Sequence, residues 1–252
     1  EMLGSLVNVW LRLGDSRRAN AVLGKKIQAL EDAGEQSAML ASLIDRISLS
    51  LSVRDLATAE KLHRRLVESH FAASLTKADK ATLFLQDGWI SFYRGRFDLA
   101  IERFGGAERL SKDIGNDALL ISALYGLSLA HKNQRDWDSA VRSLREARKW
   151  FSLSASDVQS DLVGGVELLA AYISLGLYKE GQEFFKTEFK KAGLSGRQSR
   201  DMASLYDLAL SLRLRNFENV SVETIKDTLQ YNDRLSIEKR LLFSSLLIES
   251  GV

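Results

Sequence analysis

Residues 84–107 read FLQDGWISFYRGRFDLAIERFGGA. Apolar residues precede the central Gly95 at helical spacing, and a second apolar set follows it from Phe97 onward. Such spacing is typical of amphipathic helices, and a glycine between two periodic segments marks a turn. The stretch therefore predicts two helices joined by a tight turn, with the pattern Gly95-x-Phe97-x-x-Ala100 at the junction.

This junction pattern recurs along the chain at a nearly constant interval. Each copy starts with Gly or Arg, usually has an aromatic residue or Leu two positions later, and ends on a small residue. The other copies are Arg54-x-Leu56-x-x-Ala59, Arg135-x-Trp137-x-x-Ala140 and Gly176-x-Tyr178-x-x-Gly181, with weaker ones at Gly14-x-Ser16-x-x-Ala19 and Arg215-x-Phe217-x-x-Val220. The small residues at 19, 59, 100, 140, 181 and 220 are 40, 41, 40, 41 and 39 positions apart, by subtraction. A period of this length is typical of two-helix repeats.

The small residue of each copy has a physical role. Two antiparallel helices joined by a tight turn can approach to about 8 Å only where the residue between them lacks bulk. The aromatic residue three positions earlier can cover the end of the hairpin, so we expect both to be core positions. The predicted structural anchors are Ala19, Ala59, Gly95, Phe97, Ala100, Trp137, Ala140, Gly176, Tyr178 and Gly181.

Capping residues agree with these turns. In several copies an Asp follows the turn residue, where its carboxylate can accept the free N–H groups of the next helix. Gly34, Gly115 and Gly193 stand where a helix end favours a left-handed residue. The segment Thr76-Lys77-Ala78-Asp79 has the form of a capping box and should begin a helix.

The resulting layout is one domain of consecutive helical hairpins. No Gly/Ser linker or block of charge divides the chain, and a final apolar helix would cover the end of the array. Because the sequence begins with Glu1, we expect it to be a piece of a longer protein. The predicted hairpins are residues 1–34, 35–72, 75–115, 116–153, 155–193 and 198–232, followed by a cap helix at 236–249.

The best copies resemble the tetratricopeptide repeat (TPR) family. The spacing Gly, Gly, aromatic, Ala, aromatic, Ala of that family is matched by Gly88, Gly95, Phe97, Ala100, Phe104 and Ala107. The next copy is nearly as close, with Leu124, Leu127, Trp137, Ala140, Leu144 and Ala147. The resemblance implies an all-α fold, a right-handed α-solenoid of about six helix-turn-helix repeats with a C-terminal capping helix.

Two departures from the family pattern matter. The usual TPR period is about 34 residues, so the helices here would be longer, as in the long TPR-like arrays of some bacterial transcription regulators and signalling scaffolds. The proline that often closes a TPR is absent, since the chain has no Pro. HEAT repeats share the 40-residue period, but they do not explain the Gly-x-aromatic-x-x-Ala turns.

Composition excludes several classes of site. Without Cys, the chain has no thiol nucleophile, no Cys-ligated zinc and no iron–sulfur cluster. The 35 basic and 33 acidic residues give a formal charge of +2, which disfavours nucleic acid as a partner. No apolar run approaches the ~20 residues of a membrane-spanning helix. We therefore expect a soluble, cytoplasmic protein without membrane insertion.

Catalysis finds little support in the sequence. The three histidines, His63, His70 and His131, are far apart, and no zinc-protease, hydrolase, P-loop or dinucleotide motif occurs. Basic residues cluster on predicted second helices, as at Arg142, Arg145, Arg148 and Lys149, where a solvated face is the favoured interpretation. We expect no enzyme activity, no metal and no cofactor.

The TPR resemblance also implies a binding surface. In that family the first helices line a concave groove, and the groove positions map here onto a strip with large apolar and aromatic side chains. The candidate partner-binding residues are Leu85, Trp89, Phe92, Tyr93, Tyr125, Leu129, Asn133 and Ile173. For Leu85, Phe92 and Leu129 the favoured interpretation is a core contact between successive helices, whereas Tyr and Trp more often anchor a partner.

The sequence thus predicts a non-catalytic protein–protein interaction scaffold or regulatory module that binds a partner peptide or helix in its groove. An alternative function is a ligand- or peptide-sensing regulatory domain of a larger transcription or signalling protein, in bacteria for example. A third class, an RNA-associated helical repeat, depends on the basic clusters and predicts a steep loss of affinity with salt. Self-association through the end helices stays open, and the sequence does not identify the partner.

Overall fold

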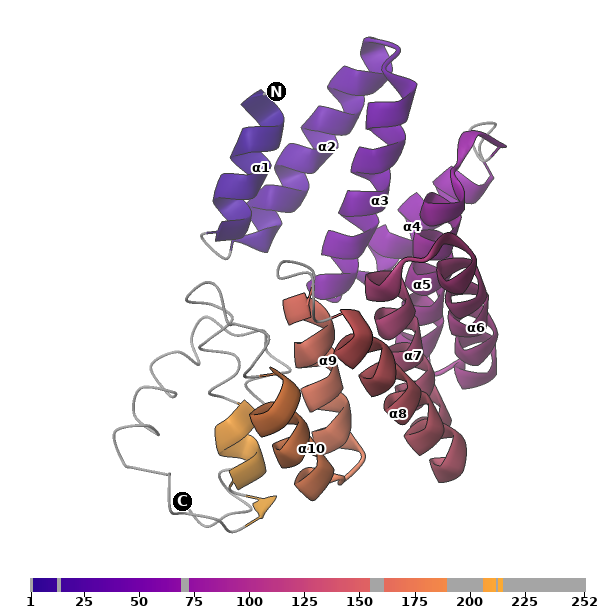
Figure 1. Cartoon of the computed structure of the whole chain (residues 1–252). Coiled ribbons are helices and arrows are strands. Elements are labelled where there is room, and N and C mark those ends of the chain that lie inside the picture. The colour runs from indigo at the N-terminus through magenta and orange to yellow at the C-terminus, as the bar shows by residue number, and fades with distance from the viewer. Residues whose placement is uncertain are drawn as a thin grey trace. The chain divides into compact units, whose positions relative to one another are not determined.

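The computed structural model describes residues 2–12, 15–68, 73–154, 161–189, 206–211 and 213–214 (Figure 1). Within these ranges all regular structure is helical and no residue forms a strand. The predicted all-α class is therefore confirmed. The predicted cap helix at 236–249 and most of the sixth hairpin at 198–232 lie outside the described residues.

The helices follow the predicted hairpins closely. Their bounds are α1 (Met2–Arg12), α2 (Ser16–Asp32), α3 (Gln36–Ser52), α4 (Leu56–Val67), α5 (Lys77–Tyr93), α6 (Phe97–Ile114), α7 (Asp117–Asn133), α8 (Trp137–Ser154), α9 (Asp161–Ser174) and α10 (Tyr178–Phe184). A five-residue π-helix, η2 (Phe185–Phe189), directly continues α10. Five of the six predicted junctions thus fall between two helices, and the sixth, near Phe217, lies outside the described residues.

The chain divides into two compact units, Glu1–Gly115 and Asn116–Val252, here called unit 1 and unit 2. Unit 1 contains α1 to α6, and unit 2 contains α7 to α10 with η2. That the whole chain forms a single repeat domain stays a prediction.

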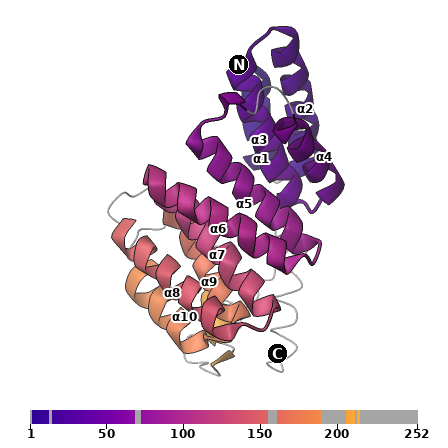
Figure 2. The same ribbon diagram turned by 90° about the vertical axis from the view of Figure 1, so that its right-hand side faces the viewer.

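Helices that follow one another in sequence pack together in both units. In unit 1, α1 packs on α2, α2 on α3 and α3 on α4, and α5 contacts α3, α4 and α6. Figure 2 shows α5 and α6 side by side. In unit 2, α9 contacts α7, α8 and α10 in the same way. The first helix of a hairpin thus packs on its own second helix and on the hairpin before it.

The turns inside the hairpins share one backbone geometry. In the four turns that the structure describes, the residue five positions before the small anchor is left-handed, with φ of 61° at Arg54, 73° at Gly95, 64° at Arg135 and 72° at Gly176. The next N–H donates to the carbonyl five residues earlier, as from Arg96 to Ser91 at 2.9 Å. This is the Schellman arrangement, which satisfies carbonyls that the helix end would otherwise leave without a partner. The repeat seen in the sequence is therefore also a repeat of backbone conformation.

Because a left-handed residue with a side chain is strained by about 1–2 kcal/mol, the turns predict opposite effects for two substitutions. Gly95→Ala should lower the free energy of unfolding by about 1 kcal/mol, although a Cβ at Gly95 would meet no atom within 4 Å. Arg135→Gly should raise it by up to about 1 kcal/mol. Urea denaturation followed by circular dichroism measures both, and a shift of the same sign in the two variants would contradict the turn assignment.

The predicted caps are present where the structure describes them. Asp15, Asp55 and Asp136 each accept a hydrogen bond from the N–H three residues ahead, at 3.0–3.1 Å. Thr76 and Asp79 form both hydrogen bonds of the predicted capping box before α5. Gly34 and Gly115 have φ of 70° and 65° and end α2 and α6, as predicted, whereas Gly193 lies outside the described residues.

Burial of the anchors agrees with their small size, with one exception among the aromatic residues. Ala19, Ala59, Ala100 and Ala140 are fully buried, and Gly181 is buried against Tyr172 and Leu210. Phe97 and Tyr178 are partly buried. Trp137 exposes 51% of its surface, so its prediction as a core position was wrong.

The residue five positions earlier in the chain explains why Trp137 is exposed. The ring of Phe97 packs edge-on against that of Phe92 at 5.5 Å between centroids. The residue five positions before Trp137 is Lys132, whose charged end offers no apolar surface for packing. Without an apolar partner at that position, Trp137 stays at the surface of unit 2.

Glycines inside the helices make room for aromatic rings. A Cβ at Gly88 of α5 would lie 2.5 Å from Cδ1 and Cε1 of Phe104, which is fully buried in α6. Reciprocally, a Cβ at Gly106 of α6 would lie 2.9 Å from Cδ1 of Phe84. In both cases a ring packs directly against a glycine of the other helix, here called a ring-into-glycine contact, and α5 and α6 approach closely there. Close helix packing therefore explains Gly106.

Candidate functional site

The candidate residues of unit 1 form an aromatic cluster on the C-terminal half of α5. The rings of Trp89 and Tyr93 stack, with centroids 5.6 Å apart and planes 23° from parallel. Phe92 meets both of these rings edge-on at 5.7 and 5.6 Å. Below them, Phe104 of α6 contacts Trp89 at 5.0 Å. Such offset and edge-to-face pairs stabilise beyond their buried area, so the cluster is a rigid surface feature.

All four unit 1 candidates combine a buried side with an exposed one. Leu85, Trp89, Phe92 and Tyr93 are partly buried, and Trp89 and Tyr93 pack against the core of unit 1. The structure thus brings together the residues that the sequence placed on one helix face. The partial burial of Leu85 and Phe92 agrees with their interpretation as contacts between helices, and partner binding at these residues stays a prediction.

Arginines border this cluster, which sequence reasoning missed. The guanidinium carbon of Arg54, in the turn between α3 and α4, lies 3.3 Å from the ring centroid of Tyr93. Arg94 donates two hydrogen bonds of 2.8 Å to the two carboxylate oxygens of Glu60. These hydrogen bonds lower the pKa of Glu60. Arg54 thus makes a cation–π contact with the aromatic cluster, and Arg94 holds Glu60 beside it.

In unit 2 the candidates differ in accessibility. Tyr125 and Leu129 of α7 are partly buried, and Asn133 is exposed and donates to the backbone carbonyl of Leu129 at 2.8 Å. Ile173 of α9 exposes only 5% of its surface and belongs to the core of unit 2. A partner could not reach Ile173 without repacking that core, so we retain Tyr125, Leu129 and Asn133 as surface candidates.

Two polar pairs connect α7 and α9 near these candidates. Ser122 donates to a carboxylate oxygen of Glu167 at 2.9 Å, and Lys132 donates to the hydroxyl of Ser174 at 2.7 Å. Burial lowers the pKa of Lys132. Each pair joins residues about one repeat apart, and that spacing is the signal by which the sequence could have revealed them.

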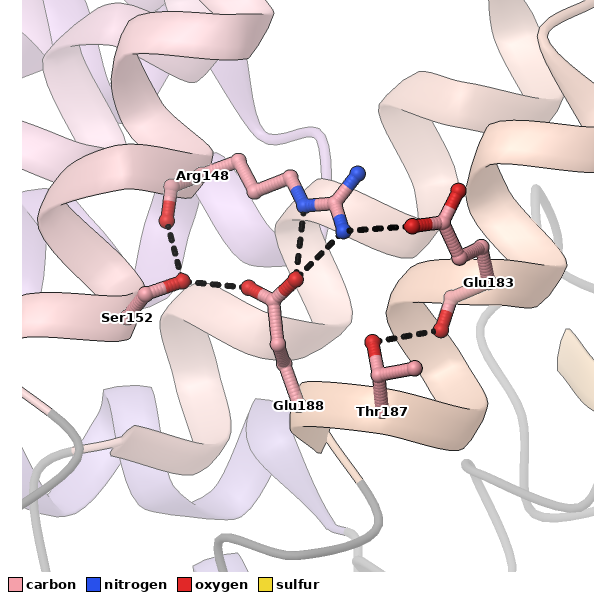
Figure 3. A network of polar contacts seen from close by, with 5 residues as sticks. All are labelled: Arg148, Ser152, Glu183, Thr187 and Glu188. Atoms are coloured by element: carbon pink, nitrogen blue, oxygen red, sulfur yellow. Dashed lines mark hydrogen bonds and ion pairs between the residues drawn. The ribbon is translucent and has the colours of Figure 1, made fainter.

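A further network in unit 2 holds the π-helix against α8 (Figure 3). Arg148 donates through Nε to Glu188 at 2.8 Å and through Nη2 to the same carboxylate, and it also lies 3.6 Å from Glu183. Ser152 donates to the other oxygen of Glu188. Although burial alone would lower it, the pKa of Arg148 is raised by its hydrogen bond with Glu188. Arg148 therefore does not belong to the solvated basic ridge that the sequence suggested.

The described histidines have structural partners. His63 of α4 lies 3.3 Å through Nε2 from the carbonyl oxygen of Leu83, and His131 lies 3.6 Å through Nδ1 from Asp136. His70 lies outside the described residues. In the part of the chain that the structure describes, no three His, Asp or Glu side chains converge as metal ligands.

No protein-family model and no curated protein matches the sequence. Among the described helices, none has the length and apolar character needed to cross a membrane.

Proposed function

We propose that the protein is a non-catalytic interaction module, a right-handed TPR-like solenoid of six hairpins with a C-terminal cap, that binds protein segments through its first helices. Its main contact surface is the aromatic cluster of α5, and Tyr125, Leu129 and Asn133 of α7 provide a second one.

The aromatic cluster of α5 carries this proposal. Trp and Tyr dominate the energetics of protein interfaces because each combines a large apolar area with a polar group. Trp89 and Tyr93 stack at 5.6 Å and are anchored on the core, so binding would cost little side-chain ordering. An amphipathic helix or an extended apolar segment is the guest that such a surface favours.

The test compares retention of interacting proteins by wild type, Trp89→Ala and Trp137→Ala, each immobilised at equal density. Trp137 is a matched control because it is exposed and lies on the second helix of its hairpin. We expect quantitative mass spectrometry of an extract from the native source to show a protein retained by wild type and Trp137→Ala. Its retention by Trp89→Ala should fall at least about tenfold, as for an anchor worth more than 1.4 kcal/mol.

Trp89 also packs on the core, so its substitution affects folding as well as binding. Circular dichroism of every variant detects misfolding, and Tyr125→Ala tests the second contact surface, in unit 2. Equal retention by wild type, a folded Trp89→Ala and a folded Tyr125→Ala would contradict the proposal. The ligand-sensing alternative would then predict that small ligands raise the melting temperature of the wild type.

A further inference from the structure

An open cavity of about 460 Å³ lies in unit 1, where the start of α1 meets the end of α2 and the start of α3 (Figure 1). Each helix contributes one small residue to its lining, Gly4 from α1, Ala29 from α2 and Ala38 from α3. A Cβ at Gly4 would meet no atom within 4 Å, so this position leaves the space unfilled. Leu3 and Leu30 add apolar surface to the wall. The volume falls in the range of small-molecule sites in proteins.

Lys26 of α2 gives this apolar cavity a positive charge. Among the described residues that line the cavity, it alone carries a charged side chain. A lysine in such a wall keeps its stem along the apolar surface and its ammonium group towards water. Lys26 is partly buried, so its charge is expected at the opening of the cavity. The cavity thus combines an apolar interior with a cation at its opening.

The ammonium group of Lys26 is available to a ligand. Within the described residues, it makes no hydrogen bond, and no carboxylate lies within ion-pair distance of it. Asp45 of α3 is the charged group whose field reaches Lys26. Burial raises the pKa of Asp45, and the charge of Lys26 offsets part of that rise. Asp45 therefore weakens the positive potential at the opening without holding Lys26 in a direct contact.

We propose that the cavity binds aliphatic carboxylates, with the alkyl chain inside and the carboxylate paired with Lys26 at the opening. Each CH₂ group transferred from water to an apolar interior strengthens binding about fourfold. The hydrogen bond from an ammonium to a carboxylate is charge-assisted and therefore stronger than one between neutral groups. A wholly polar ligand would lose its hydration here, since the described lining offers no polar side chain except Lys26. This inference does not depend on the proposed interaction function.

The test measures the binding of decanoate to the full chain by isothermal titration calorimetry, below the concentration at which decanoate forms micelles. Any affinity tag is placed at the C-terminal end, because Met2 lines the cavity. We expect decanoate to bind about tenfold more tightly than octanoate, since it buries two further CH₂ groups. Decyltrimethylammonium has the same alkyl chain with a positive charge, and it should bind at least about tenfold more weakly than decanoate.

Two substitutions change the charge at the opening in opposite directions. Lys26→Met keeps an unbranched side chain but removes the ammonium group, and it should weaken decanoate binding about tenfold. Asp45→Asn removes a competing negative charge and should strengthen binding by about two- to threefold. Lys25→Met is the matched control, because Lys25 is exposed on the same helix and does not line the cavity. This variant should bind decanoate as the wild type does.

Gly4→Leu tests the cavity itself, because a side chain at this position occupies the unfilled space. Decanoate binding should fall at least about tenfold in this variant while its circular dichroism stays that of the wild type. Should the variant not fold, nuclear Overhauser effects in the wild type between decanoate and the methyl groups of Ala29 and Ala38 locate the ligand. Equal affinity for decanoate and decyltrimethylammonium, unchanged affinity in a folded Lys26→Met, or no Overhauser effect at these alanines would overturn the proposal.

Discussion

Gly88→Ala is expected to lower the free energy of unfolding by about 1–2 kcal/mol, although alanine is the better helix former by about 1 kcal/mol. The reason is the ring of Phe104, which would lie 2.5 Å from the new methyl group. Phe104 is fully buried and in contact with Trp89, so it has little room to move. Overpacking therefore outweighs the gain in helix propensity.

The effect of Gly88→Ala on stability should change sign in a variant that lacks the ring of Phe104. Phe104→Ala alone should cost about 3–5 kcal/mol, because it leaves a cavity between α5 and α6. In that background Gly88→Ala meets no ring, and it should raise stability by about 0.5–1 kcal/mol. The coupling between the two positions, measured by a double-mutant cycle in urea, isolates the ring-into-glycine contact.

Gly105→Ala is the matched control for Gly88→Ala. Gly105 lies inside α6, and a Cβ there would meet no atom within 4 Å. This variant should be more stable than wild type by up to about 1 kcal/mol. Equal effects of Gly88→Ala and Gly105→Ala on the free energy of unfolding would contradict the close contact between Gly88 and the ring of Phe104.

The second large effect is expected at Arg148. Its side chain is 24% exposed and that of Glu188 22%, so the pair is largely removed from water. Arg148→Ala leaves the carboxylate of Glu188 without its main partner and should cost about 2–4 kcal/mol. Because η2 contacts α8 through this network, amide hydrogen exchange within residues 185–189 should accelerate more than elsewhere in unit 2.

Arg65 offers the comparison that this prediction needs. It pairs with Glu31 at 2.8 Å, but the two side chains are 47% and 42% exposed. Arg65→Ala should therefore cost less than about 1 kcal/mol. An equal loss of unfolding free energy in the two variants would show that burial does not strengthen the Arg148 network. It would also contradict the proposed role of this network in holding the π-helix.

The local parts of the fold were predictable because short patterns determine them. The left-handed turn at Gly95, the capping box at Thr76 and the buried Ala100 each follow from residues within a few positions of one another. The exposure of Trp137 was not predictable from its own pattern, since it depends on whether an apolar partner stands five residues earlier.

The candidate site was predictable only in part. The cluster of Trp89, Phe92 and Tyr93 lies on one helix face, which periodicity reveals. The stacking of Arg54 on Tyr93 joins residues 39 positions apart, so it follows only once the register of neighbouring hairpins is known. Pairs such as Arg148 and Glu188, 40 residues apart, could have been found by searching for opposite charges one period apart.

The packing of each helix on near neighbours in sequence has a kinetic consequence. In the described part of unit 1, the main helix contacts join helices that are adjacent in sequence or that are separated by one helix, as α3 and α5 are. Contacts between nearby segments close short loops, and chains rich in such contacts cross the folding barrier quickly. Opening can likewise begin at one end, because separating α1 from α2 leaves the interface of α5 with α6 intact. We therefore expect mechanical pulling on unit 1 to yield stepwise rupture, one hairpin at a time, in place of a single all-or-none event.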